Sequence, residues 1–215
     1  MQQWAFDRGV LWAMELNVPP PRVAPRIAAQ IQELDTDAIP ALVAAGSADS
    51  DTLARRFAGE RRCFGVYVEN TIAAYGWVSQ RSEYIGEQER EFKIPNDEAY
   101  VWDCATLAPY RNQHLYSALL SHINHVLYQE HMRRTWIGAQ EKNCASLHGF
   151  SNAGFHPILL TTYTRLLDLH AVWVAPWKNA PRELVTSFQR AWTADDQHVW
   201  GNLAWSWRGN VRHKR

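Results

Sequence analysis

The chain has 215 residues, of which 47% are hydrophobic and 20% are charged. This balance is typical of a folded globular protein of about one domain and excludes a largely disordered chain. Lys and Arg together number 22, as do Asp and Glu, so the net charge is zero at pH 7. No overall field draws such a chain to nucleic acid or to an anionic membrane, and we expect neither as a partner.

The three cysteines, Cys63, Cys104 and Cys144, lie far apart and form no CxxC pair. This spacing argues against a disulfide framework and against a structural zinc site, so we expect no metal and a reducing, cytoplasmic setting. Near the N-terminus, Asp7 and Arg8 interrupt the apolar residues before a signal-type run can form, and no later run has membrane length. The sequence therefore predicts a soluble, unprocessed protein.

The first third of the chain predicts alternating strands and helices. Prolines hold residues 17–26 extended, and the apolar spacing of Ile39, Leu42 and Val43 is helical. Asn70 separates two apolar, β-branched runs, which is typical of a hairpin. The expected elements are a strand at 10–16, a strand at 27–34, helices beginning at Asp35 and covering 51–58, and hairpin strands at 63–69 and 72–79.

The middle of the chain comes after a hydrophilic segment, 80–96, and we interpret the charged part of this segment, 81–93, as a solvated loop. Residues 98–107 are apolar on both faces, as in a central strand, and 111–130 have the periodicity of a long helix. Residues 135–139 predict another buried strand. A strand, a helix and a strand in this order favour a right-handed crossover between two parallel neighbours, so the fold class is mixed α/β (α+β).

The C-terminal third predicts a helix at 143–153 ended by Gly154, strands at 155–166 and 170–174, and a helix at 181–191. Six of the 11 tryptophans follow Val172. We divide the chain into an N-terminal strand and Pro-rich linker at 1–26, a main domain at 27–175, and a Trp-rich extension at 176–215. The extension is a candidate partner surface, and a homodimer is one open alternative.

Two segments carry a resemblance to a known family. Residues 104–120, CATLAPYRNQHLYSALL, place a strand end, a proline-containing turn and an arginine before the long helix, where the family has Arg-Gly-x-Gly-x-Gly/Ala. Residues 143–155, NCASLHGFSNAGF, match the spacing of Asn-x-x-Ala/Ser-x-x-x-Tyr-x-x-x-Gly-Phe. With the element order over 27–166, these segments resemble the Gcn5-related N-acetyltransferase (GNAT) superfamily, whose members transfer acyl groups from acyl-coenzyme A to amines. The resemblance implies a mostly antiparallel sheet with a central, splayed parallel strand pair flanked by helices.

The resemblance implies acetyl-CoA, or another acyl-CoA, as the cofactor. Its diphosphate would bind the free N–H groups at the start of the long helix, where the dipole favours an anion. Its pantetheine arm would pair with the end of strand 98–107. The resemblance implies that Asn143 bonds the pantetheine and that Ser146 faces it. Asn143 could equally serve only to start the helix, and Ser146 could equally be only an exposed residue. The cofactor-binding residues that the resemblance implies are Thr106, Leu107, Arg111, Asn112, Gln113, His114, Leu115, Tyr116, Asn143, Ser146 and Phe150.

The chain departs from the family pattern at four of these positions. Asn112, His114 and Tyr116 stand where glycine or a small residue is usual, and Phe150 stands where the family often has a tyrosine acid. Asn tolerates a left-handed backbone, whereas the other two side chains add bulk beside the phosphate path. Losing a positioned acid costs roughly 10²–10⁴-fold in rate, which is less than proximity can supply.

Acyl transfer also needs an oxyanion donor and a base for the amine proton. A backbone N–H near Leu107 can be the oxyanion donor. The base candidates are Asp103, Tyr100 and Glu98; for Asp103 a structural hydrogen bond is an equal alternative, and Glu98 at a strand edge is better explained as solvated. The resemblance also implies that segment 81–93 overhangs the acceptor site, where Glu83, Glu87 or Glu91 could attract a cationic amine, although a solvated loop is the interpretation that we favour. Cys104 lies in a buried strand without a histidine partner, so we expect no covalent acyl-enzyme.

The leading hypothesis is an acetyl-CoA-dependent N-acyltransferase in which a small-molecule or peptide amine attacks the thioester directly in a ternary complex. Two alternatives stay open. One is a catalytically inactive GNAT-like binding module, motivated by His114, Tyr116 and Phe150. The other is a transferase that uses a longer acyl or an aminoacyl donor.

Overall fold

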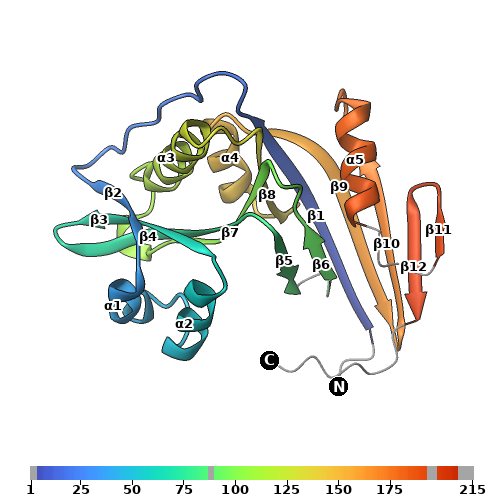
Figure 1. Ribbon diagram of the computed structural model, residues 1–215, viewed down its shortest axis with the longest axis horizontal. Helices are drawn as coiled ribbons and strands as arrows, with labels where there is room; N and C mark the ends of the chain where they lie inside the picture. The colour runs from blue at the N-terminus through green and yellow to red at the C-terminus, as the bar shows by residue number, and fades with distance from the viewer. Residues whose placement is uncertain (1–3, 87–89, 193–197, 208–215) are drawn as a thin grey trace.

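A computed structural model describes residues 4–86, 90–192 and 198–207 (Figure 1). Within them, ten strands form one sheet in the order β11-β12-β10-β9-β1-β8-β7-β4-β3-β2, and β5 and β6 form a separate two-stranded sheet. The strands are β1 Trp4–Glu15, β2 Gln30–Leu34, β3 Arg62–Val68, β4 Thr71–Ser79, β5 Ser82–Ile85, β6 Arg90–Lys93, β7 Glu98–Thr106, β8 Arg134–Gln140, β9 His156–Leu166, β10 Leu169–Pro176, β11 His198–Trp200 and β12 Leu203–Trp207. The helices are α1 Ile39–Ala44, α2 Ser50–Ala58, α3 Leu115–Gln129, α4 Cys144–Asn152 and α5 Arg182–Trp192, with 3-10 turns at Thr36–Ala38 and Ala108–Tyr110.

The neighbours in the large sheet pair antiparallel except for β7 and β8, which are parallel. Helix α3 joins these two strands, as the strand-helix-strand order predicts. The mixed fold class, with its mostly antiparallel sheet and its central parallel pair, is therefore confirmed.

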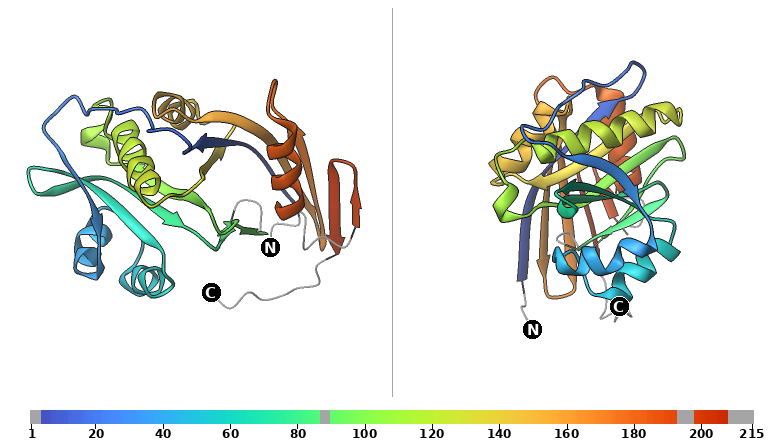
Figure 2. Two further views of the ribbon diagram at one scale, coloured as in Figure 1. Left: turned by 45° about the horizontal axis from the view of Figure 1, so that its top comes forward. Right: turned by 90° about the vertical axis from the view of Figure 1, so that its left-hand side faces the viewer.

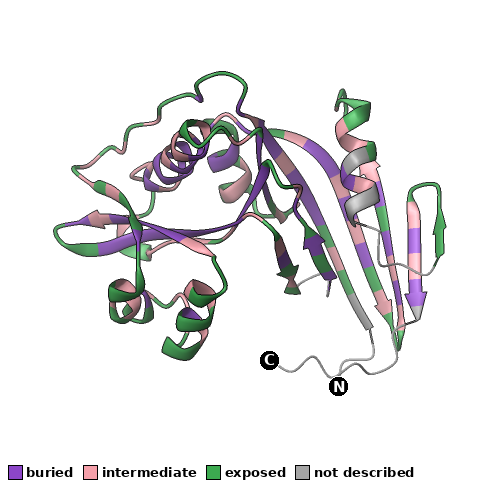
Figure 3. Ribbon diagram, in the orientation of Figure 1, coloured by how far each residue is buried: buried purple, intermediate pink, exposed green. Residues whose placement is uncertain are grey.

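Helices cover both faces of this curved sheet (Figures 1 and 2). Helices α3 and α4 pack on one face, where Leu119 and Phe150 belong to a core with residues of β3, β4, β7 and β8. Helices α1 and α2 cover part of the opposite face, around the fully buried Trp77. Helix α5 and strand β6 cover the rest of that face, where Phe188 and Phe92 meet the sheet. The buried residues accordingly run along the central strands (Figure 3).

Strands from all three predicted segments share this sheet. The N-terminal β1 lies between β8 and β9, and the residues after it run extended over α3 to reach β2 at the far edge (Figure 1). Along this path Pro21 accepts a hydrogen bond from Ser121 of α3. At the other end, β12 extends the sheet from β10; residues 193–197 and 208–215 of the predicted extension lie outside the described part of the chain.

Four sequence predictions need correction. The strand predicted at 10–16 is longer and runs over Trp4–Glu15. The strand predicted from residue 27 begins at Gln30. The helix predicted from residue 111 begins at Leu115, because Asn112 and His114 have left-handed backbones that an α-helix cannot contain. The segment 81–93, predicted as a solvated loop, holds β5 and β6, and its polar residue Glu83 is 5% exposed, while Glu87 lies outside the described residues.

The parallel pair β7–β8 is joined at one end only. The two strands pair from Glu98 opposite Arg134 to Val101 opposite Ile137 and not beyond, although β7 continues to Thr106 and β8 to Gln140. Past this point β7 pairs with β4 and β8 with β1. The strands therefore diverge, as the resemblance predicts.

A β-bulge lies on β7 just past the divergence. Trp102 faces Trp77 and Ala105 faces Tyr75, so two residues of β7, at 103 and 104, stand opposite the single Gly76. Asp103 has a φ of 42°. Gly76 has no side chain, and an added Cβ would lie 2.7 Å from the Sγ of Cys104, so a larger residue here would displace the Cys104 side chain.

Candidate active site

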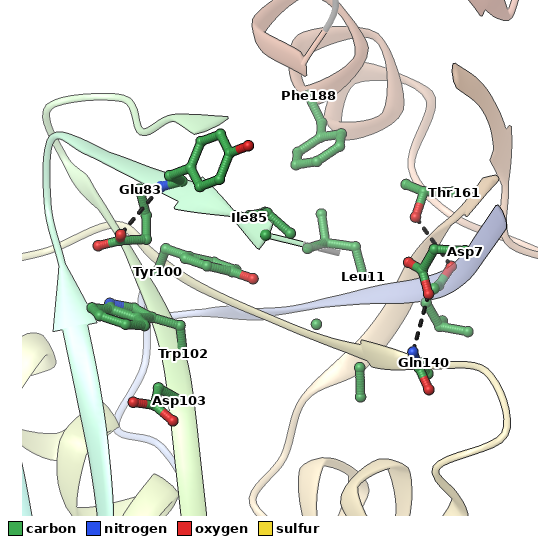
Figure 4. A pocket seen from close by; sticks show the side chains of 16 residues that line it. Asp7, Leu11, Glu83, Ile85, Tyr100, Trp102, Asp103, Gln140, Thr161 and Phe188 are labelled. Carbon is green, nitrogen blue, oxygen red and sulfur yellow. Dashed lines mark hydrogen bonds between the residues drawn. The ribbon is translucent and has the colours of Figure 1, made fainter. Parts of the chain in front are cut away.

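Two cavities lie where β7 and β8 diverge. The first, of about 590 Å³, is here called the α3-side cavity; it is formed by the end of β7, the loop before α3 and the first turns of α3 and α4. The second, of about 370 Å³, is here called the β5-side cavity; it is formed by β1, β5, β7, β8 and Phe188 of α5 (Figure 4). Cys104 lines the α3-side cavity and Asp103 lines the β5-side cavity, so the two neighbouring residues of the bulge face different cavities.

The loop before α3 has the left-handed backbone conformation that glycine usually provides. Asn112 has a φ of 64° and His114 a φ of 58°, so two non-glycine residues occupy the left-handed region. His114 is the N-cap of α3 and makes no side-chain capping bond. The first helical N–H bond runs from Ala118 to His114, which leaves the amides of the first turn without a partner inside the helix.

The α3-side cavity is cationic. Arg26, Arg111, His114 and His148 line it, and no Asp or Glu is among its described lining residues. Arg26 comes from the N-terminal linker, and its main-chain N–H and its guanidinium donate to the carbonyls of Gln113 and Asn112 at 2.9 and 3.3 Å. A pair of arginines beside free helix amides suits a phosphorylated ligand.

One buried hydroxyl in this cavity has no partner in the described chain. Thr106 Oγ1, at the end of β7, is inaccessible to solvent and makes no hydrogen bond with the described residues. The Thr106 carbonyl accepts from Arg111 Nε at 3.3 Å. A buried hydroxyl normally finds a partner, so a polar ligand atom at this strand end would complete its bonding. Thr106, the free helix amides and the two arginines together fit the pantetheine and diphosphate groups of coenzyme A.

Helix α4 closes the cavity opposite α3. The side chain of Asn143 is its N-cap and accepts from the Ser146 N–H at 3.2 Å, so Asn143 starts the helix and also lines the cavity. Tyr116 reaches across from α3, and its ring lies 6.1 Å from that of Phe150, centroid to centroid. Burial raises the pKa of Tyr116 well above its usual range, and a hydrogen bond with Ser146 offsets part of that rise.

Most of the predicted cofactor residues come together here. Those that line the α3-side cavity are Thr106, Arg111, Asn112, His114, Leu115, Tyr116, Asn143 and Ser146. Three do not. Leu107 packs toward α1 and α2, Gln113 only accepts the Arg26 N–H, and Phe150 is a core residue with 1% exposure. The Leu107 N–H donates to the Ala73 carbonyl at 2.9 Å, so a free oxyanion donor near Leu107 must be another amide.

The β5-side cavity has an acidic and aromatic lining. Tyr100, Trp102 and Asp103 of β7 lie on one side with Glu83, and Asp7 of β1 and Gln140 of β8 lie on the other (Figure 4). No Lys or Arg is among the described residues that line it. Gln140 donates to Asp7 at 3.2 Å. A cavity with carboxylates on opposite walls suits a cationic guest.

Asp103 is held by an arginine behind the cavity. Arg56 Nη1 of α2 lies 2.5 Å from Asp103 Oδ2, and the guanidinium of Arg56 lies 4.6 and 5.0 Å from the ring centroids of Trp102 and Trp77. Glu83 is held in a similar way, by Arg61 at 2.7 Å and by the Ser79 hydroxyl at 2.6 Å. Both carboxylates are therefore fixed in position while they line the cavity.

Glu98, the third base candidate, lies at the paired end of β7. It is 1% exposed and accepts from Arg133, Arg134 and the indole of Trp136. It lines neither cavity. The structure thus brings Tyr100 and Asp103 together and separates Glu98 from them; Glu98 is a buried ion-pair residue rather than the solvated residue that we predict from the sequence.

Several lining residues were not predicted. Arg26 and Asp7 belong to the N-terminal segment, which the sequence analysis separates from the main domain, and Gln140 and Phe188 carry no motif. Only the pairing of β1 between β8 and β9 brings Asp7 to the site, and no local pattern encodes that pairing. Cys104 was predicted to be inert, and burial raises the pKa of its thiol to about 12.

Comparison with known families agrees with this geometry. The model of the Acetyltransferase (GNAT) family matches residues 29–155, which is more than half of the chain. The chain therefore belongs to this family of N-acetyltransferases, as its motifs indicate. No curated protein matches the chain in sequence.

Solved structures show the same fold at low identity. A putative GNAT acetyltransferase from Novosphingobium aromaticivorans has a TM-score of 0.52 and 15% identity, over 82% of this chain and 69% of that one. A GCN5-related N-acetyltransferase from Sphaerobacter thermophilus has a TM-score of 0.57 and 13% identity, over 76% of this chain and 53% of that one. A GNAT-family acetyltransferase from Colwellia psychrerythraea has a TM-score of 0.51 and 12% identity, over 75% and 55%. The chain thus spans little more than half of the length of the last two. In the described residues, no helix combines the length and the apolar character needed to cross a membrane.

Proposed function

We propose that the protein is an acetyl-CoA-dependent N-acyltransferase that acts on a small-molecule or peptide amine. One observation supports this most directly: the divergent end of β7 and β8 separates a cationic cavity from an acidic one. An anionic thioester donor on the first side and a cationic amine on the second would meet at the bulge of β7. Holding two reactants in this way can supply much of the rate acceleration of a transfer reaction.

The donor would lie in the α3-side cavity. Its diphosphate would contact the first-turn amides of α3 together with Arg111 and Arg26, and its pantetheine arm would follow the end of β7 past the Thr106 hydroxyl. When bound, the cofactor supplies the reactive thioester. The protein supplies position and charge.

The oxyanion donor that we propose is the N–H of Thr106. Successive amides along a strand point to opposite sides, and the Leu107 N–H points to β4, where it is bonded to Ala73. The Thr106 amide accordingly points away from β4, on the same side as its own carbonyl, which meets Arg111. This amide is one residue before Leu107, in the region where the donor is predicted, and as a backbone group it needs no particular side chain.

Asp103 and Tyr100 are the groups that we propose for the amine. Both line the β5-side cavity, and the Tyr100 hydroxyl lies 3.7 Å from where a Cβ on Gly138 would stand, at the divergence of the strands. Asp103 would attract the cationic acceptor. The bound ammonium would first lose one proton to water, because only a neutral amine can attack. After the attack the nitrogen is again positively charged and acidic, so even a carboxylate paired with Arg56 can accept its next proton.

Calorimetric titration with acetyl-CoA, followed by thiol release with a panel of amines, tests this proposal. We expect binding in the micromolar range or tighter, and Thr106→Val should weaken it several-fold because a partner of the ligand is lost. Thr164→Val, an exposed change on β9, is the matched control.

Absence of acetyl-CoA binding at millimolar concentration would end the proposal. Binding without thiol release by any amine would instead support an inactive binding module. A preference for a longer acyl or an aminoacyl thioester would change the donor and leave the reaction class in place.

A further inference from the structure

Two departures from the family pattern are in contact with each other. Tyr116 replaces a small residue on α3 and Phe150 replaces a hydroxyl-bearing one on α4, and their rings lie 6.1 Å apart. Gly149 permits this contact, because an added Cβ there would lie 2.5 Å from Tyr116 Cδ1. The phenol of Tyr116 thus occupies space that α4 leaves open beside Phe150.

The two rings differ in what they face. Phe150 is 1% exposed and packs against Trp12 and Phe155 in the core under α3 and α4. Tyr116 is partly exposed and lines the α3-side cavity together with Cys104 and Thr106, at the strand end where the thioester would lie. Tyr116 and Ser146 both line this cavity. A hydroxyl group is therefore present on the donor side of the bulge, and it comes from α3.

We propose that the Tyr116 hydroxyl donates a hydrogen bond to the sulfur of the departing coenzyme A thiolate, so that Tyr116 is a catalytic residue of this chain. This inference rests on the proposed function. It assigns to Tyr116 a part of the chemistry that Phe150 cannot perform.

The step balances as follows. The amine nitrogen forms a bond to the thioester carbon, and the carbonyl electron pair moves to oxygen. When the carbonyl reforms, the C–S bond breaks and its electron pair stays on sulfur, where the Tyr116 O–H hydrogen bond stabilises it. The amine nitrogen loses its extra proton to Asp103 in the β5-side cavity, which passes it to water. Water later protonates the released thiolate, which gives the amide and free coenzyme A.

Tyr116 stabilises this anion without giving up its proton. Burial holds the pKa of Tyr116 well above its usual range, whereas a free thiol has a pKa of about 8.5. The phenol therefore stays protonated at neutral pH and beside the thiolate. A hydrogen bond from a neutral donor to a charged sulfur then lowers the pKa of the bound thiol.

The first test needs no acceptor. Coenzyme A bound to the protein is titrated with base, and its thiolate is followed by ultraviolet absorbance in the wild type and in Tyr116→Phe. We expect the pKa of the bound thiol to be higher in the variant by about one unit or more. Tyr128→Phe, on the same helix and away from both cavities, is the control. Equal titration curves for the wild type and Tyr116→Phe would overturn the proposal.

The second test uses transfer from acetyl-CoA to whichever amine of the panel reacts fastest. Tyr116→Phe should lower kcat by about 10- to 100-fold with little change in the KM for acetyl-CoA. An unchanged kcat, or a loss confined to KM, would contradict the proposal.

The two failures are distinguishable. If the wild type neither binds acetyl-CoA nor releases thiol, the proposed function is wrong. If the wild type is active and Tyr116→Phe is equally active, only the role of Tyr116 is wrong.

Discussion

The two ends of the parallel strand pair β7–β8 use charge in opposite ways. At the paired end, Glu98 is buried and bonded to Arg133 and Arg134, and the charges satisfy one another. At the divergent end, carboxylates line one cavity and arginines line the other. Where the strands diverge, space opens between them, and charged residues of β1, β5, β7 and the loops line that space.

This difference separates a structural role from a functional one. The ion pairs of Glu98 line neither cavity and offer no charge to a ligand, and their removal affects folding. Asp103 and Glu83 are also ion-paired, with Arg56 and Arg61, but they face a cavity. Charges that face a cavity leave part of their field for a ligand and contribute less to stability. Changes at the paired end should therefore alter the free energy of unfolding, and changes at the divergent end should alter binding and rate.

The largest expected effect is at the paired end. Glu98→Gln leaves Arg134, whose side chain is 6% exposed, beside a neutral partner. Removing one partner of a buried pair costs roughly 3–5 kcal/mol, and because Glu15 still pairs with Arg134 we expect about 3 kcal/mol. Urea unfolding measures this loss, with the exposed Glu91→Gln as control. If Glu98→Gln lowers the free energy of unfolding no more than Glu91→Gln does, the two ends of the strand pair do not differ in their structural role.

Asp103→Asn should act on rate instead. Asn tolerates the left-handed backbone at this position, so the fold should persist while the carboxylate is lost. We expect kcat/KM for the acceptor to fall about 100-fold, as for loss of a base, with less than 1 kcal/mol lost in stability. Steady-state kinetics against pH measure this, and Asp168→Asn in an exposed turn is the control. If Tyr100→Phe shows the fall and Asp103→Asn does not, Tyr100 is the base.

The sequence predicts α3 and the loop before it better than it predicts the roles of the charged residues on β7. The apolar spacing of Leu115, Leu119 and Ile123 predicts α3, and the motif before it predicts the loop, because both are local patterns. Glu98 and Asp103 lie on one apolar strand, and sequence alone cannot separate their roles. Their roles depend on where β7 leaves β8, which is a property of the assembled sheet.

Other residues reach the site only because of the order in which the strands pair. Arg26 reaches the loop before α3 because the linker crosses that helix on its way from β1 to β2. Asp7 reaches the β5-side cavity because β1 inserts between β8 and β9. Residues that are distant in sequence and carry no motif are found only when the pairing of strands is known.

Arg26→Ala sharpens the charge contrast at the divergent end. Arg26 is exposed and lines the cationic cavity, so its loss should weaken acetyl-CoA binding by about tenfold, as for one charge-assisted hydrogen bond. Calorimetry with acetyl-CoA and with its 3′-dephospho form shows which phosphate Arg26 contacts. If it contacts the 3′-phosphate, the wild type and Arg26→Ala should bind the dephospho form with equal affinity. Arg22→Ala, an exposed arginine of the same linker outside the cavity, is the control. Equal affinities for the two variants would show that the cavity's charge does not come from Arg26.

His114→Gly is expected to have the smallest effect and the opposite sign to Glu98→Gln. His114 holds a φ of 58°, which costs a residue with a Cβ about 1–2 kcal/mol, whereas glycine adopts this conformation freely but loses more entropy on folding. We expect a net gain of about 0.5–1 kcal/mol in unfolding free energy, measured by thermal or urea unfolding. Ser151→Gly, inside the right-handed α4, should instead lose about 0.5–1 kcal/mol and serves as the matched control. A loss of stability in His114→Gly would mean that the imidazole stabilises the loop. The left-handed backbone at His114 would then not destabilise the fold.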